Sequence, residues 1–387
     1  MKRIHAIDFC RGLVMIIMAL DHSREFLHIT SLTQNPTDLA TTTPLLFFTR
    51  WITHLCAPTF VFLSGTSAWI SSRRRPDPGE NRRFLLKRGI WLVILEFTLI
   101  NFALWMDIRF RSLIFEVIGT IGVGFIILSL LYYVSPKMLA LVAIVIIFSH
   151  DLLNSVMLPS ISPLAIAGSM AIRPGVFEIS PHFTFIVAYP IIPWLGIMLA
   201  GFACGTLFEK DIFLRRKLWL RFGLASIGLF ALLRFLNFYG NPSRWTHQHN
   251  GLFSFLSFIN VNKYPPSLLY TLIMLGILFL LIALSEGKDN RFTRIVMVYG
   301  RTPLFYFVIH LYIIHLLLFP MVFLQGFHTG DLVFGAMNYG RPATGSGIGL
   351  GGVYLVWIGV VVLMYPLCLL YGRFKATHRQ YPWLRYL

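Results

Sequence analysis

The chain has 387 residues, of which 56% are hydrophobic and only 13% are charged, and its mean hydropathy is +0.71. Soluble domains carry about 25% charged residues, so this composition excludes an ordinary soluble enzyme and indicates a multi-pass membrane protein. The formal net charge of +17 would suit a nucleic-acid-binding protein, but no motif of a nucleic-acid-binding fold accompanies it, and we predict no nucleic-acid partner.

Apolar segments of about 20 residues, the length that crosses a bilayer, recur along the chain. They predict one all-α domain over residues 1–387, a polytopic bundle of about ten transmembrane helices at 8–28, 45–72, 84–106, 113–135, 138–158, 186–207, 218–239, 266–286, 303–325 and 348–371. Asp8 and Arg11 interrupt the first apolar region, so we expect it to remain as a span and not to be cleaved as a signal peptide.

Lysine and arginine are concentrated in every second connection and in the C-terminal tail. This asymmetry predicts that the N- and C-termini are cytoplasmic. The residues concerned are Arg73, Arg74, Arg75, Arg82, Arg83, Lys210, Arg215, Arg216, Lys217, Lys288, Arg291, Arg294, Arg301, Arg373, Lys375, Arg379 and Arg385. The other connections include three longer segments, near 159–185, 240–264 and 326–347, which we expect to cover a site that opens outward.

The first span ends in MALDHSREFLH, which places Asp21, His22, Glu25 and His28 in the outer half of the membrane. Ionisable residues within a span are costly and face the bundle interior or a water-filled cavity. Near the cytoplasmic end of the same span, Asp8 and Arg11 are one helical turn apart. We expect them to form an intrahelical ion pair.

The second span runs inward from the same side and carries Arg50 and His54 one turn apart, so its polar residues should meet those of the first span. Later spans add Glu96, Asn101, Glu116, Arg234 and Asn237. One interpretation is a structural polar network that locks the helices together. The other, which we favour, is acid–base chemistry or a proton relay, because imidazoles face carboxylates.

The remaining histidines carry weaker signals. His310 and His315 are five residues apart, which is not a zinc motif, and we expect them to be packing histidines. His247 and His249 are at best weak metal candidates. GxSxG, Walker and HExxH motifs are absent from the sequence, so serine hydrolases, NTPases and zinc proteases lose their usual support.

Several strings resemble one family over almost the whole chain. IDFCRGLVMIIMALDH, RWITHLCAPTFVFLSG, YPIIPWLGIMLAGFACG, LRFLNFYGNPSRW, INVNKYPPSLLY and YGRTPLFYFVIHLY resemble, in this order, segments of the heparan-alpha-glucosaminide N-acetyltransferase catalytic-domain family. The strings are most similar to a bacterial branch of this family, which belongs to a superfamily of transmembrane acyltransferases. The resemblance implies ten or eleven membrane helices and transfer of acetyl from cytosolic acetyl-CoA to an amino sugar on the far side.

The resemblance also suggests roles for individual residues. His22 stands where the lysosomal members have a catalytic asparagine, and His54 stands where they have an aspartate. Their catalytic histidine lies between these two positions, where this chain has only His28, at a different spacing. Asn262 and Lys263 match the family's Asn-Lys pair, although anchoring of the eighth span would also explain them.

We therefore expect an acetyl-CoA- or acyl-CoA-dependent transmembrane acyltransferase of the cell (cytoplasmic or inner) membrane, acting on a hydroxyl or amine of an envelope sugar or glycolipid. In this hypothesis His22 is the base, supported by Asp21 or Glu25, and His54 is a second acid–base group. His28 could instead carry the acetyl group covalently. The sequence leaves direct transfer and the acetyl-histidine path open.

The other expected contacts follow from charge. Residues expected to bind substrate or the oxyanion are Arg50, Asn101, Arg234, Asn237, Asn262 and Lys263, and those expected to bind the coenzyme are Arg11 and Arg301. We expect no metal. The expected partners are the lipid bilayer, acyl-CoA and the sugar or glycolipid acceptor. The sequence leaves open whether the protein forms a homodimer. The alternatives are a proton-coupled transporter or flippase for a sugar or lipid, or an assembly partner without chemistry.

Overall fold

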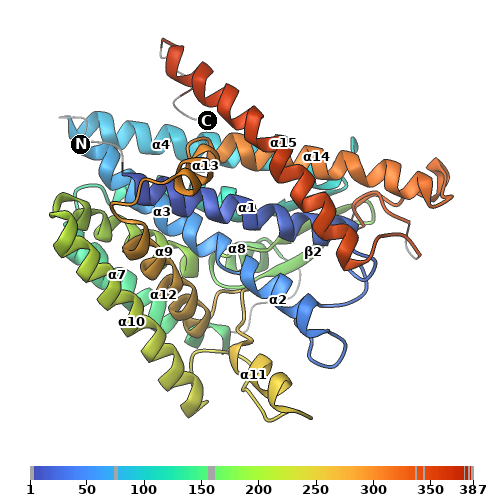
Figure 1. The fold of residues 1–387 in the computed structure, drawn as a ribbon, viewed down its shortest axis with the longest axis horizontal. Coiled ribbons are helices and arrows are strands. Elements are labelled where there is room, and N and C mark those ends of the chain that lie inside the picture. The colour runs from blue at the N-terminus through green and yellow to red at the C-terminus, as the bar shows by residue number, and fades with distance from the viewer. Residues whose placement is uncertain are drawn as a thin grey trace.

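The computed structural model describes residues 4–73, 77–155, 162–335, 338–342, 345–378, 380, 381 and 384. Within them the chain is a polytopic helical membrane protein (Figure 1). Arg74, Arg75, Arg379 and Arg385 of the basic connections lie outside the described residues, as does the end of the predicted span 138–158.

The elements alternate between long helices and short connecting segments. The first half contains α1 (His5–Leu27), α2 (Pro44–Thr53), α3 (Cys56–Ser72), α4 (Pro78–Leu95), a π-helical turn (Glu96–Ile100), α5 (Asn101–Trp105), β1 (Ser112–Phe115), α6 (Val117–Leu130), α7 (Pro136–Ser149), a 3-10 turn (His150–Ser155), α8 (Pro163–Ala171), β2 (Gly175–Ser180) and β3 (Phe183–Val187). The second half contains α9 (Ile191–Cys204), a 3-10 turn (Gly205–Glu209), α10 (Ile212–Leu236), α11 (Gly251–Ile259), α12 (Leu268–Ser285), α13 (Arg291–Gly300), α14 (Pro303–Leu324), a 3-10 turn (Thr329–Asp331) and α15 (Leu350–Thr377).

Eight helical stretches of the described chain are long and apolar enough to cross a membrane, and each coincides with a predicted span. They are Pro44–Ser72, Pro78–Trp105, Pro136–Leu153, Ile191–Glu209, Ile212–Leu236, Leu268–Ser285, Pro303–Leu324 and Leu350–Thr377. The other two predicted spans correspond to α1, which is helical but carries five charged residues, and to α6, which has only 14 residues.

Helix α1 lies at the centre of the bundle, where it packs against α2, α3, α12, α13, α14 and α15. This position explains how a helix with five charges can be stable in a membrane, because its polar side chains face other helices. Helices α1 and α13 approach each other closely at two glycines. A Cβ at Gly300 of α13 would overlap the Asp8 carbonyl oxygen, and a Cβ at Gly12 of α1 would overlap the Val296 carbonyl oxygen. Small residues allow this backbone contact.

The start of α1 and the end of α15 lie on the same side of the bundle, which we call the terminal face (Figure 1). Helix α1 begins there at His5 and α15 ends there at Thr377, so the central helix runs from the terminal face to the opposite face. Near the terminal face Arg11 lies 3.8 Å from Asp8, and the predicted intrahelical ion pair is confirmed.

A break between α2 and α3 places His54 at a kink. Pro58 has no N–H, so it cannot donate to the carbonyl four residues earlier, which is that of His54. The Tyr270 hydroxyl of α12 donates to this carbonyl instead, at 2.8 Å. The kink is thus stabilised by a side chain from a distant span.

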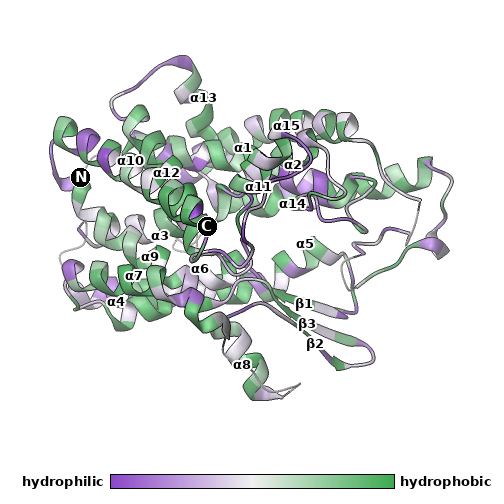
Figure 2. Ribbon diagram, turned by 90° about the horizontal axis from the view of Figure 1, so that it is seen from below, coloured by the Kyte–Doolittle hydropathy of each residue, from purple (hydrophilic) through white to green (hydrophobic). Residues whose placement is uncertain are grey.

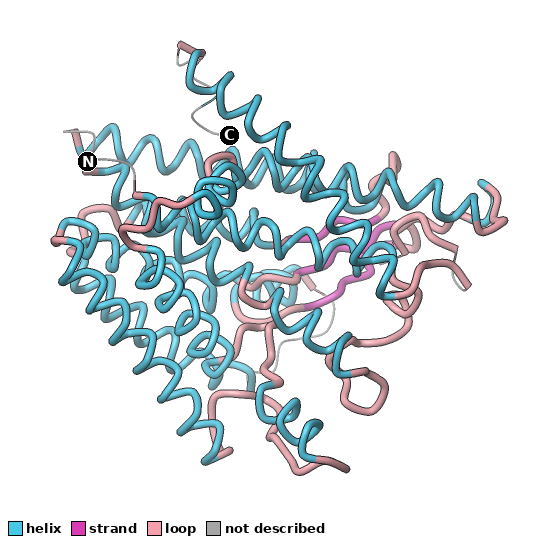
Figure 3. Tube along the Cα trace, viewed as in Figure 1, coloured by secondary structure: helices cyan, strands magenta, loops and turns pink. Residues whose placement is uncertain are grey.

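A three-stranded sheet was not predicted from the sequence. Its order is β1-β3-β2, with β1 parallel and β2 antiparallel to β3, and it lies beside α5, α6 and α8 (Figures 2 and 3). The predicted span 113–135 was therefore wrong at its start, where Leu113–Phe115 belong to β1. Phe115, Phe185 and Val187 bury one face of the sheet, which explains why these residues look like part of a span.

Candidate functional site

Two arginines from different helices converge on Asp21, which is buried near the opposite end of α1. Arg24, one turn further along α1, contacts Asp21 Oδ1 at 3.2 Å, and Arg50 of α2 forms a shorter ion pair with Oδ2. The predicted meeting of the first two spans is confirmed by this ion pair. Both oxygens of Asp21 are occupied, so this carboxylate fixes α2 against α1 and is not available as a base.

His22 pairs with a histidine from the ninth predicted span. Its Nδ1 atom lies 2.8 Å from Nε2 of His310, and the two rings are stacked with 5.0 Å between centroids. His310 is fully buried, and its Nδ1 lies 2.7 Å from the carbonyl oxygen of Tyr306, one turn earlier in α14. The two histidines therefore form a hydrogen-bonded chain that ends on the α14 backbone.

The other ring nitrogen of His22 is open. Among the described residues Nε2 has no hydrogen-bond partner, and the His22 side chain is only partly buried. The ring is held between Phe26, stacked at 6.4 Å, and Phe307, edge-on at 6.2 Å between centroids. His22 thus presents one free nitrogen from a fixed ring.

Glu25 is held by a tyrosine from the segment before α15. The Tyr339 hydroxyl donates to Glu25 Oε1 at 3.0 Å, and its ring stacks on Trp105 with 5.2 Å between centroids. Tyr339 has a left-handed backbone conformation with φ of 57°, which begins a tight turn at Gly340. The turn brings a hydroxyl from the opposite face to within one helical turn of His22.

Arg341 fastens this segment to the end of α1. Its guanidinium is buried and donates to the carbonyl oxygens of Phe26 and His28 at 3.2 and 3.0 Å, and to Ser31 Oγ at 2.8 Å. Burial lowers the pKa of Arg341 to about 10, so it stays charged at neutral pH. The segment 338–342 therefore covers the α1 end as a fixed element.

Lys263 adds a third cation to the site. It is buried, with its ammonium 4.9 Å from the ring centroid of Tyr264 and 5.8 Å from that of Tyr189. Its charge acts on Asp21 and His22, and also on Glu116. Two carboxylates, those of Asp21 and Glu25, and two cations, Arg50 and Lys263, thus lie within electrostatic reach of His22. We call Asp21, His22, Glu25, Arg50, Lys263 and His310 the central cluster.

The other two candidate histidines occupy different positions. His54 is buried at the α2–α3 kink, its ring 5.6 Å from that of Tyr270, and its Nδ1 has no hydrogen-bond partner within the described chain. His28 caps the end of α1, where its Nδ1 lies 3.0 Å from Thr30 Oγ1. His54 stays near the charges of the central cluster, whereas His28 belongs to the covered end of α1.

Four residues expected to bind substrate use their polar groups to hold the backbone. Asn101 donates to the carbonyls of Glu96 and Ile114 and accepts from the Ile114 N–H, which ties β1 to α5. Arg234 donates to four carbonyls, those of Ser243, Ser257, Phe258 and Asn260; Asn237 pairs with the backbone of Trp245, and Asn262 donates to Pro265. These contacts explain the positions of all four side chains without a ligand.

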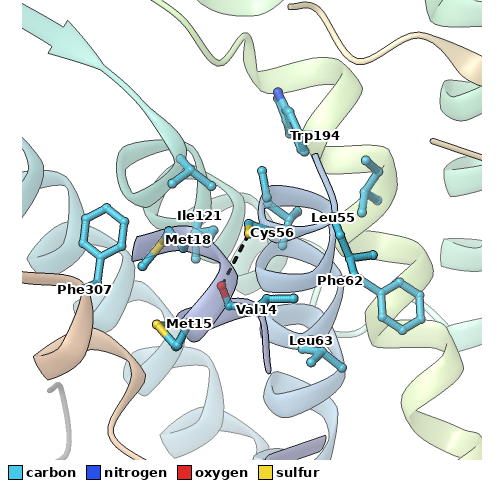
Figure 4. Packing of buried hydrophobic residues seen from close by; sticks show 14 of the residues in the cluster. Val14, Met15, Met18, Leu55, Cys56, Phe62, Leu63, Ile121, Trp194 and Phe307 are labelled. Carbon is cyan, nitrogen blue, oxygen red and sulfur yellow. Dashed lines mark hydrogen bonds between the residues drawn. The ribbon is translucent and has the colours of Figure 1, made fainter. Parts of the chain in front are cut away.

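A cavity of about 400 Å³ opens near the terminal face. Its polar lining comes from Asp8, Arg11, Arg88, Arg301, Lys375 and the serines 64, 67 and 71 of α3. The rest of its lining is mainly apolar and includes Met15 of α1 together with Ile121 and Phe307, which lie near this part of α1 (Figure 4). Ligand pockets have volumes of about 300–1,000 Å³, and the cavity is within this range.

Phe307 connects the cavity to the central cluster. Its ring lines the cavity and also contacts the imidazoles of His22 and His310, at 6.2 and 6.0 Å between centroids. The predicted coenzyme-binding residues Arg11 and Arg301 both line this cavity. In the part of the chain that the structure describes, no group of three His, Cys, Asp or Glu side chains could hold a metal.

The sequence did not reveal the roles of His310, Phe307 and Tyr339. His310 was expected to be a packing histidine, and its fully buried position fits that expectation, but it also contacts His22. The two histidines are 288 positions apart, so no local pattern could pair them. The one available signal was the presence of a histidine inside an otherwise apolar span.

A comparison with known protein families gives one match. The family model described as heparan-alpha-glucosaminide N-acetyltransferase, catalytic, matches residues 3–244, which is more than half of the chain and runs from α1 to just beyond α10. Lys263, His310 and Tyr339 lie outside the matched range. A search of curated proteins finds no match.

Proposed function

Because the chain belongs to the heparan-alpha-glucosaminide N-acetyltransferase catalytic family, we propose that it moves an acetyl or other acyl group from cytosolic acyl-CoA to a hydroxyl or amine of an extracytoplasmic sugar or glycolipid. The family supports a membrane acetyltransferase, and the donor and acceptor are our proposal. The observation that carries it is the cavity, whose lining includes cations near the terminal face and Phe307, the ring of which contacts His22.

The cavity suits the two halves of an acyl-CoA. Arg11, Arg88, Arg301 and Lys375 provide positive charge for the phosphates, and the apolar walls suit the less polar arm that carries the thioester. An arm entering from the terminal face would bring its acyl end to Phe307, beside His22. The acyl group of the donor and the proposed base, His22, would thus both lie next to the Phe307 ring.

In the reaction, the acceptor's hydroxyl or amine would attack the carbonyl carbon of the thioester, and His22 Nε2 would remove the proton of the attacking group. The C–S bond breaks, and the same nitrogen returns the proton to the leaving thiolate. The carboxylates of Asp21 and Glu25 stabilise the imidazolium that forms in between, and Lys263 lies where it can orient an anionic or polar acceptor. We place acceptor entry on the opposite face, near Tyr339.

The test uses purified protein in lipid nanodiscs with acetyl-CoA and an amine or sugar acceptor. We expect acetyl transfer or slow hydrolysis by the wild type, and loss of about 100-fold or more in kcat for His22→Ala. The matched control is His247→Ala, because His247 lies outside the site and its ring contacts Trp245. Normal turnover of His22→Ala would remove His22 as the base.

The coenzyme site is tested separately with Arg301→Ala, which should raise KM for acetyl-CoA about 10-fold and leave kcat unchanged. Arg216→Ala is the control, since Arg216 is an exposed arginine near the start of α10 that does not line the cavity. If acyl-CoA does not bind to the wild type at all, the enzyme class is wrong and the transporter alternative takes its place.

A further inference from the structure

We infer that His310 is a positioning residue that holds His22 in the tautomer with a free Nε2 lone pair. This inference rests on the proposed function, in which His22 Nε2 is the base. It assigns a role to a residue outside the range that the family model matches, and it follows from three hydrogen-bonding atoms in a row: His22 Nδ1, His310 Nε2 and the Tyr306 carbonyl.

The Tyr306 carbonyl fixes which atom donates in each of these two hydrogen bonds. A carbonyl oxygen only accepts, so His310 Nδ1 must carry the hydrogen in the 2.7 Å contact with Tyr306. In the neutral ring Nε2 of His310 is then an acceptor, and the hydrogen in the 2.8 Å contact must belong to His22 Nδ1. A neutral His22 with a hydrogen on Nδ1 has its lone pair on Nε2.

The ring of His310 cannot turn easily to reverse this order. It is fully buried, stacked on Tyr306 with 5.0 Å between centroids, and flanked edge-on by Phe307 at 6.0 Å. Its acceptor is a backbone carbonyl within its own helix. Rotation of the ring would bury a hydrogen-bonding nitrogen without a partner, at a cost of about 1–3 kcal/mol.

The free Nε2 is the atom that the proposed reaction uses as its base. It is the one ring nitrogen of the pair without a described partner, and it belongs to a ring that contacts Phe307 at the inner end of the cavity. When Nε2 takes the acceptor's proton, His22 becomes an imidazolium whose Nδ1–H still donates to His310. His310 stays neutral throughout, and the proton leaves from Nε2 to the thiolate.

His315 shows that not every buried histidine of α14 has this role. It is as buried as His310 and lies five residues further along the helix. Its two ring nitrogens lie 2.8 and 2.9 Å from the carbonyls of Ala103 and Tyr339, so it joins backbone segments and does not contact His22. It is therefore the matched control for His310.

A spectroscopic experiment tests the tautomer without any assay of activity. Protein with 15N-labelled histidine is placed in nanodiscs, and the His22 signals are identified by their loss in His22→Gln. In the wild type and in His315→Gln, we expect the neutral His22 ring to carry its hydrogen on Nδ1. In His310→Leu, we expect the population of the His22 tautomer with the hydrogen on Nε2 to increase. A hydrogen on Nε2 in the wild type would overturn the inference even if the protein is an acyltransferase.

Kinetics then test the consequence for catalysis. His310→Leu should lower kcat by about 100-fold with KM for acetyl-CoA unchanged, because the base has its lone pair on the wrong nitrogen. His310→Gln should recover about a tenth of the wild-type kcat, since its side-chain oxygen can accept from His22 Nδ1. His315→Gln should lose thermal stability and keep the kcat of its folded fraction. Equal activities of His310→Leu and His310→Gln would contradict a hydrogen-bonding role.

Discussion

The ring of Phe307 stands edge-on to the imidazole of His22, with 6.2 Å between the centroids, and the same ring lines the cavity of the terminal face. One side chain therefore contacts both the space that we assign to acyl-CoA and the histidine that we assign as the base. The size of this side chain should decide how far an acyl group can extend toward His22.

Phe307→Ala should widen the acyl range. Removing the ring enlarges the inner end of the cavity, so butyryl-CoA and hexanoyl-CoA should gain at least about 10-fold in kcat/KM relative to acetyl-CoA, the scale of a few methylenes in an apolar pocket. The measurement is kcat/KM for a series of acyl-CoA chain lengths.

Phe305→Ala is the control for this experiment. Phe305 lies on the same helix but stacks on Tyr371, with 4.2 Å between centroids, and does not line the cavity. If both variants change the chain-length preference equally, Phe307 is not the boundary.

Removing Arg50 should strongly destabilise the fold. Its partner Asp21 lies in the bundle interior, so Arg50→Ala leaves a buried carboxylate with Arg24 alone, at a cost of about 3–5 kcal/mol in the free energy of unfolding. Arg50→Lys should cost less because it keeps the charge. Denaturant unfolding in nanodiscs measures both.

A double-mutant cycle with Asp21→Asn isolates the ion pair. The two substitutions together should cost about 1–3 kcal/mol less than the sum of the single costs. Strict additivity would show that the two side chains contribute independently and that the pair does not hold α2 to α1.

Tyr270→Phe should destabilise the kink between α2 and α3. It removes the hydroxyl that donates to the His54 carbonyl, which Pro58 cannot satisfy, so we expect a loss of about 1–3 kcal/mol. Adding Pro58→Ala restores a backbone N–H donor and should recover part of the loss. Thermal unfolding of the four proteins of this cycle is the measurement, and an identical loss with and without the Pro58→Ala substitution would contradict the explanation.

Asp107, in the connection from α5 to β1, should make stability depend on pH. Burial alone would raise its pKa, but hydrogen bonds from the Arg111 side chain and from the N–H groups of Arg109 and Arg111 hold the pKa below its ordinary value. A lowered pKa stabilises the fold above the unfolded value of about 3.9, and the contribution is lost as pH falls through the folded-state pKa.

Asp107→Asn should therefore lower the unfolding temperature at about pH 7 and have a smaller effect at about pH 3. The comparison is the difference between wild type and variant at each pH. An equal difference at both values would show that the carboxylate charge contributes nothing.

Much of the bundle could be predicted from the sequence because a membrane span is encoded locally. A run of about 20 apolar residues is enough to recognise one, and all ten predicted spans contain a helix in the structure. The sheet was missed for the same reason, since β1 continues directly into α6 through Glu116 and its residues are as apolar as those of a helix. Hydropathy cannot distinguish the two.

The candidate site was predicted only where its residues share a helix or neighbouring spans. Asp21, His22 and Glu25 lie within two turns of α1, and helical geometry could place Arg50 near them. Asn101 and Arg234 looked equally functional, yet each is used to satisfy backbone groups. A polar residue's type does not reveal whether its partner is a carbonyl or a substrate.

The sequence by itself therefore determined that this protein is a helical membrane protein with a cluster of ionisable residues in its first span and the motifs of an acetyltransferase family. The tertiary structure alone decided that His22 meets His310, that Tyr339 reaches Glu25, and that Phe307 lies between the cavity and the cluster. The physical reason is separation along the chain: these partners are brought together by helix packing around α1, and no local pattern of residues records which faces of distant helices will touch.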